Sequence, residues 1–246
     1  MTGATRSAGP TVVLKTLAVV GMACLLLAVG ILNLVPPADG YEISLFQAFP
    51  LYFWGLFIGS ALIGQLVIIG SLRYSGGRDR IWILGLALVV TCGVILLLIP
   101  FIRGYPMYGG LDELTHIGFV RDIPEVGIAG LIYPAMHLII YSASGATGLE
   151  AQTILKLLPL VVSLVSVGGS FCMLREFYNQ THALYGLPFI LVLFIGYKTA
   201  VPNTLSVLYI PFILYLFIKE RRTGAISIAY FLIIAIFGIV LLHPLT

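Results

Sequence analysis

Long apolar runs separated by short polar segments make up most of this chain. Seven runs approach the ~20 apolar residues that a helix needs to cross the hydrocarbon core of a bilayer. They are roughly Val12–Val35, Phe49–Leu72, Ile81–Ile102, Gln152–Leu174, Ala183–Lys198, Thr204–Ile218 and Ala225–Leu242. The fifth and sixth runs are short, and a turn-forming Val-Pro-Asn triplet separates them. The pattern therefore predicts an all-α integral membrane protein with about seven transmembrane helices.

One further apolar stretch, Ile128–Tyr141, contains Pro134 and His137 and is shorter than a span. Its length, about 14 residues, is more typical of an interfacial or re-entrant segment. If it does not cross the membrane, the 13 Lys and Arg residues divide nine to four between the two sides. The larger group is Arg6, Lys15, Arg73, Arg78, Arg80, Arg175, Lys219, Arg221 and Arg222.

The more basic side of a membrane protein is normally cytoplasmic. We therefore expect a protein of the cell membrane with its N-terminus in the cytoplasm and its C-terminus outside. Ile128–Tyr141 then lies on the outer surface, and the large outer loop contains one or two interfacial helices. The first 35 residues resemble a signal peptide, but their apolar core is too long, so we interpret them as a retained span.

Composition agrees with a membrane protein and excludes several other classes. Apolar residues make up 60% of the chain and charged residues 9%, whereas soluble domains have about 45–50% and about 25%. No basic stripe lies outside the short loops, so nucleic acid is not an expected partner. The three cysteines lie inside apolar runs and are interpreted as buried hydrophobic residues.

The longest polar segment is the outer loop 103–127, which follows the third run. Pro106 and the glycines at 109 and 110 are expected to end the preceding helix. Asp112 is a good N-cap candidate for a short helix that Pro124 would stop. On that helix Asp112 lies four residues before His116 and Glu113 lies three before it, so all three can share one face.

Two carboxylates and an imidazole at a membrane surface suit a general base or a cation site. Asp112, Glu113 and His116 are therefore the candidate catalytic residues. Asp112 and Glu113 are also candidate ligands of a divalent cation such as Mg²⁺ or Mn²⁺. The alternative is an N-cap with solvated charges on an interfacial helix.

Other polar residues of the outer face are candidate substrate-binding residues, each with a plainer interpretation. Arg121 can meet a phosphate or pair with Asp122, and Lys198 can bind a donor phosphate. Both can instead be snorkelling anchors in the headgroup region. His137 can be a packed histidine on an apolar surface helix. His243 can simply end the last helix.

The order of short motifs on the outer face resembles the GT-C class of polytopic glycosyltransferases. Asp-Glu-x-x-His at 112–116 follows a span, and Tyr-Pro-x-x-His-Leu at 133–138 comes next. Thr147-Gly148-Leu149-Glu150 then precedes another span. The resemblance covers roughly Ile95 to Thr246. It implies an enzyme that takes sugars from polyprenyl-phosphate donors, with an acidic residue of the outer loop as catalytic base or metal organiser.

The chain also departs from this class. Two spans precede the one before the acidic loop, so residues 1–80 are interpreted as an added transmembrane hairpin. Residues 81–246 form the GT-C-like region. The chain ends at the outer mouth of a span without the further spans typical of the class, which suggests a truncated product.

The expected function is transfer of a sugar from a polyprenyl-phosphosugar to an extracytoplasmic glycan, lipid or protein, with membrane lipid as the surrounding partner. One alternative is a non-catalytic membrane subunit or inactive remnant. Another is a lipid or solute transporter. Ionisable residues are almost absent from the centres of the predicted spans, which argues against transport.

Overall fold

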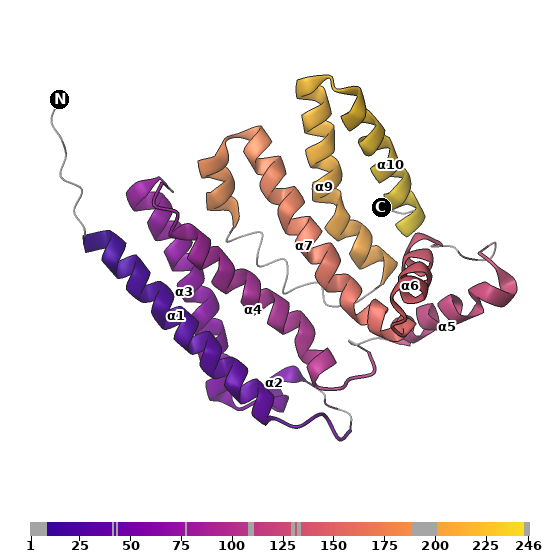
Figure 1. Cartoon of the computed structure of the whole chain (residues 1–246), viewed down its shortest axis with the longest axis horizontal. Helices are drawn as coiled ribbons and strands as arrows, with labels where there is room; N and C mark the ends of the chain where they lie inside the picture. Colours follow the sequence, from indigo (N-terminus) through magenta and orange to yellow (C-terminus); the bar gives the residue numbers. More distant parts are fainter. Residues whose placement is uncertain are drawn as a thin grey trace. The chain divides into compact units, whose positions relative to one another are not determined.

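The computed structural model describes residues 9–40, 42, 44–76, 78–107, 111–128, 131, 134–187 and 201–243. Within them the regular structure is α-helical and contains no strand (Figure 1). The helices are α1 (Gly9–Leu34), α2 (Leu45–Ala48), α3 (Leu51–Ser75), α4 (Trp82–Ile102), α5 (Leu111–Val126), α6 (Pro134–Thr147), α7 (Ala151–Phe177), α9 (Pro202–Thr223) and α10 (Ile226–Leu242). Residues 180–187 are helical as well.

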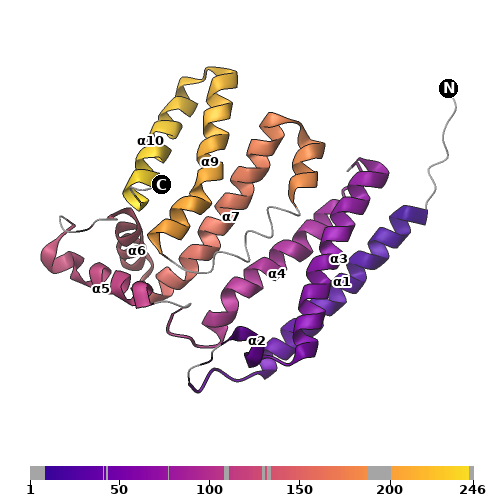
Figure 2. The same cartoon turned by 180° about the vertical axis from the view of Figure 1, so that it is seen from behind.

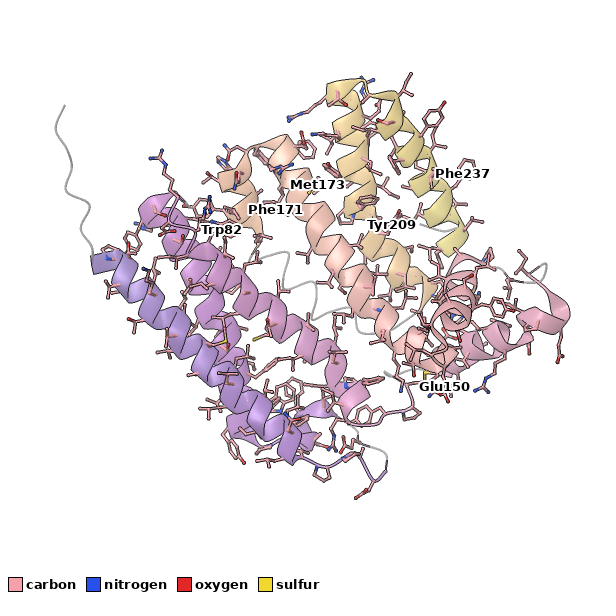
Figure 3. All side chains as sticks on the ribbon, in the orientation of Figure 1. Trp82, Glu150, Phe171, Met173, Tyr209 and Phe237 are labelled. Atoms are coloured by element: carbon pink, nitrogen blue, oxygen red, sulfur yellow. The ribbon has the colours of Figure 1, made fainter. Side chains whose placement is uncertain are left out.

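Five of these helices, α1, α3, α4, α7 and α9, are long and apolar enough to cross a membrane. Helix α10 is apolar but shorter. Large apolar side chains on them face outward, such as Phe237 on α10, which is 66% exposed (Figure 3). Bilayer lipid is the environment that suits such surfaces. The predicted all-α membrane fold is confirmed, whereas most of the predicted run Ala183–Lys198 lies outside the described residues.

The surface segment Ile128–Tyr141 was predicted with the wrong bounds. Helix α6 begins at Pro134, because proline is well suited to a helix start. It continues through the Ser-Ala-Ser-Gly sequence that seemed to end it, and stops at Thr147. Gly148 follows with φ +72°, and its N–H donates to the Ser144 carbonyl at 2.9 Å. This left-handed glycine is what ends the helix.

Contacts divide the chain into two compact units, Met1–Leu96 and Leu97–Thr246, with the division inside α4. In the first unit α1 packs on α3. Asp79 orders the turn into α4: its carboxylate accepts hydrogen bonds from the Ser71 hydroxyl at 2.5 Å and the Ile81 N–H at 3.1 Å. The predicted division after residue 80 falls in this turn and stays a prediction.

In the second unit α7 and α9 lie side by side and run in the same direction (Figures 1 and 2). Near their starts Leu155 and Leu205 share one buried cluster. Farther along, Gly169 lies against Phe212. At their C-terminal ends the Lys219 ammonium lies 2.7 Å from a Glu176 carboxylate oxygen. The two helices therefore begin at one end of the unit and finish at the other.

Helices α5 and α6 pack together across the end at which α7 and α9 begin. We call this the α5–α6 end. Gln152 of α7 donates to the Pro106 carbonyl at 2.7 Å, and Lys156 donates to the Tyr105 carbonyl at 3.1 Å. The chain therefore returns in α7 to the same end at which it left α4. Helices α5 and α6 therefore do not take the chain to the opposite end of the second unit. This is the arrangement that the loop charges predict.

The contact between α7 and α9 predicts a sharp difference between two neighbouring glycines. A Cβ at Gly169 would come 2.8 Å from the Phe212 backbone nitrogen, whereas a Cβ at Gly168 would meet nothing within 4 Å. We expect Gly169→Ala to reduce the free energy of unfolding by about 1–3 kcal/mol through overpacking. Gly168→Ala should be neutral or slightly stabilising, because alanine favours helix. Unfolding of the full chain in mixed micelles measures both, and equal effects would contradict the close packing.

Candidate functional site

The centre of the α5–α6 end is a pair of histidines. His116 of α5 and His137 of α6 have their Nδ1 and Nε2 atoms 3.0 Å apart, within hydrogen-bond distance. Both side chains are buried, with 7% and 1% of their surface exposed. The Phe119 ring stands edge-on to the His137 ring, with centroids 5.5 Å apart. The pair joins two helices whose histidines are 21 residues apart in the chain.

The two neighbouring carboxylates of α5 have opposite environments. Asp112 and Glu113 both lie in the first turn of the helix, where the helix dipole favours negative charge. Asp112 is exposed, whereas Glu113 is 1% exposed. Successive helix residues point about 100° apart, so one carboxylate faces outward while its neighbour faces the protein. At the α5–α6 end the Asp112 side chain is therefore accessible from outside, whereas the Glu113 side chain is enclosed.

The surroundings of His116 favour its neutral form. Burial lowers the pKa of His116 most, and the nearby His137 lowers it further, while the Asp112 carboxylate opposes both. Neutral imidazole is therefore the state expected at pH 7. The electrostatic effect of Asp112 on His116 agrees with their predicted position on one face of the helix.

The predicted ends of α5 and of the helix before it were wrong. Helix α4 ends at Ile102, before Pro106 and the later glycines, and Gly104 closes its last turn. Gly104 has φ +73°, its N–H donates to Phe101, and the Tyr105 N–H donates to Pro100 at 2.9 Å. These two bonds form a Schellman motif.

Helix α5 begins at Leu111, two residues before the start that an N-cap at Asp112 implies, so Asp112 lies within its first turn. Pro124 does not stop it. The helix continues to Val126, and the Gly127 N–H donates to the Ile123 carbonyl at 2.9 Å. Proline near a helix end removes one hydrogen bond only, and the bond from Gly127 keeps this last turn closed.

The other predicted residues are dispersed. Arg121 and Asp122 are exposed on α5. Nine residues separate Arg121 from Asp112, which places it about 14 Å along the helix and about half a turn round. His243 is half-buried directly after Leu242, which packs at the α5–α6 end. Lys198 lies outside the described residues.

Two cations at this end were not among the predicted site residues. Arg103, which follows α4, is 5% exposed. Lys156 of α7 lies 5.3 Å above the Phe101 ring while it donates to Tyr105. Figure 3 shows Glu150 at the start of α7, at the same end. The one sequence signal for Arg103 is its position directly before Gly104, the glycine that closes the helix.

The described residues give no support to a metal ion shared by Asp112 and Glu113. One carboxylate is exposed and the other is buried, so the two lie in opposite environments. Among the described residues no group of three or more His, Cys, Asp or Glu side chains gathers to hold an ion.

Comparison with protein-family models, with curated proteins and with solved structures finds no match to this chain. Its function has to be argued from the site itself.

The contrast between Asp112 and Glu113 predicts different effects of two equivalent substitutions. Glu113→Gln should lower the free energy of unfolding by about 1–3 kcal/mol, because it replaces a buried carboxyl group by an amide with different hydrogen-bonding groups. Asp112→Asn should change it by less than about 0.5 kcal/mol, since the side chain is exposed. Unfolding of each variant in mixed micelles decides the point. A larger loss for Asp112→Asn would mean that the burial pattern is wrong.

Proposed function

We propose that this chain is a membrane glycosyltransferase that moves a sugar from a polyprenyl-phosphate donor to an acceptor at the extracytoplasmic face. The observation that carries the proposal is the exposed Asp112 carboxylate, one helical turn from the buried histidine pair. The outer-face motifs that resemble the GT-C class supply Asp112, His116 and His137 together. These three residues come from separate motifs in the chain, and helices α5 and α6 bring them together at one end of the second unit.

In this reaction the Asp112 carboxylate takes the proton of an acceptor hydroxyl as a general base. The acceptor oxygen then forms a bond to the anomeric carbon of the donor sugar. The bond from that carbon to the phosphate oxygen breaks, and polyprenyl phosphate leaves with the electron pair. The exposed position of Asp112 suits this role, because an acceptor has to reach the base from water while the donor approaches from lipid.

The negative charge on the leaving phosphate needs a cation near the reaction centre. Arg121 lies about 14 Å along α5 from Asp112 and on the opposite face of the helix, so it is not placed to contact a phosphate that leaves beside Asp112. Lys156 is the better candidate for the leaving group. Its ammonium is held at the α5–α6 end by the Tyr105 carbonyl and the Phe101 ring. His243 and Asp122 are left as candidate contacts for the acceptor.

The buried polar side chains of the described residues argue against the transport alternative. In the helices that can span the membrane they are serines and one threonine: Ser60, Ser71, Ser163, Ser166, Ser170, Thr204 and Ser206. Buried charged groups in this part of the chain, Arg103 and Glu113, lie outside those helices. Transport pathways for ions and polar solutes usually place ionisable groups at membrane depth.

The transferase proposal is tested by mass spectrometry of surface glycans and polyprenyl-linked sugars in the cell that carries the gene. Deletion should remove one sugar from an acceptor, and the wild-type chain should restore it. Asp112→Asn should fail to restore it, because loss of a general base slows a reaction by about 10²–10⁴-fold.

Asp39→Asn is the matched control, since Asp39 is also exposed but lies in the first unit. It should restore the sugar fully at equal membrane levels. Unchanged glycans on deletion of an expressed gene would end the transferase proposal and favour a non-catalytic subunit or remnant. Full restoration by Asp112→Asn would remove Asp112 from the site.

A further inference from the structure

The short distance between His116 Nδ1 and His137 Nε2 limits how many protons these two facing nitrogens can hold. A hydrogen bond between two ring nitrogens needs one nitrogen with a proton and one without. His116 Nδ1 and His137 Nε2, at 3.0 Å, can therefore share one proton between them. If both rings became imidazolium, both facing nitrogens would carry protons, no bond would remain, and two positive rings would repel each other in a buried position.

The pair is set into the contact between α5 and α6. Ile117 and Val120 of α5 and Met136 and Ile140 of α6 belong to one buried cluster. Separation of the rings thus requires the two helices to move. Asp112 lies one turn before His116 on the same rigid helix, so that movement would also displace the proposed catalytic carboxylate.

The pair lies among helices α5, α6, α7 and α10. Their charged or titratable side chains, besides the two histidines, are Asp112, Glu113, Arg121, Asp122 and Glu125 of α5, Tyr141 of α6, Lys156, Cys172, Arg175 and Glu176 of α7, and Tyr230 of α10, with Glu150 and His243 flanking α7 and α10. Lys156 is already bonded to the Tyr105 carbonyl. Electrostatic effects on His116 come from His137 and, in the opposite direction, from Asp112.

We infer that His116 and His137 are positioning residues for Asp112: one proton shared between the two facing ring nitrogens fixes α5 on α6, and conversion of both rings to imidazolium opens that contact. The inference rests on the proposed function for the role of Asp112, but not for the behaviour of the histidine pair. The proton-dependent contact between the two histidines then lies one helical turn from Asp112, the proposed base.

The direction of the pH dependence follows from the environment of His116. Its pKa is lowered in the folded chain, so the unfolded chain binds more protons. The stabilising effect is therefore fully present above about pH 6.5, the ordinary value for histidine, and is lost as the pH falls through the lowered value. Acid should loosen α5, whereas mild alkali should not.

Nuclear magnetic resonance of the full chain in lipid nanodiscs tests the shared proton without any substrate. The chain has four histidines, which ¹⁵N-histidine labelling reports separately. At pH 7.5 we expect a scalar coupling across the bond between His116 and His137. The pair should titrate in two steps more than about one pH unit apart, and the coupling should vanish at the second step.

His182, which is exposed and bonded to Asn179, is the internal reference. In His116→Asn or His137→Gln the remaining histidine should titrate in a single step, at a higher pH than the second step of the pair. Titration of both histidines together with His182, and no coupling at any pH, would overturn the inference.

The pH profile of sugar transfer tests the positioning role. The double variant His116→Asn with His137→Gln replaces the rings by amides that can still bond but do not titrate. The pH at which sugar transfer falls on acidification should be lower in the double variant than in wild type, by about one pH unit or more. An unshifted profile would overturn the positioning role. If the wild-type chain transfers no sugar at any pH, the proposed function is overturned. The magnetic resonance result then tests the shared proton independently of that function.

Discussion

The close, parallel contact of α7 with α9 is the constraint on which the second unit depends. Gly169 lets the α7 backbone approach Phe212 closely, and without a hydrophobic effect inside lipid such close packing is a main source of helix association. Because the two helices run in the same direction, their starts form one platform. Helices α5 and α6 pack on that platform, and the candidate site lies between them. Loss of the contact between α7 and α9 would therefore disperse the residues of the candidate site on α5 and α6, which are far from Gly169 in the chain.

Much of the fold could be predicted from the sequence, because apolar length alone determines which segments can cross a bilayer. Loop charge predicted that α6 does not span, since only that choice kept Arg175 and Lys219 on the basic side, and α6 does pack with α5 across one end of the second unit. The helix ends were less predictable. Pro124 and Pro106 looked like stops, but the stops are Gly127 and Gly104, which adopt positive φ. Sequence shows where proline is, but not which glycine takes the left-handed conformation.

The candidate site was predicted only in part. Spacing correctly put Asp112, Glu113 and His116 close together on one helix. It could not show that Glu113 is buried and Asp112 exposed, because that depends on which face α6 and α7 cover. The contact of His116 with His137 joins residues from two helices, and no local pattern reports it. The burial of Arg103 was equally hidden, because a cation after a span normally looks like a headgroup anchor.

The central claim is that the site lies on one membrane face and the basic ends of α7 and α9 on the other. Cysteine labelling with a membrane-impermeant maleimide tests it most directly, in a chain whose three native cysteines are replaced by alanine. Asp122→Cys, exposed on α5, should react in intact cells. Arg222→Cys, where the native side chain is 51% exposed, should react only after permeabilisation. Labelling of both positions from the same face would contradict the account.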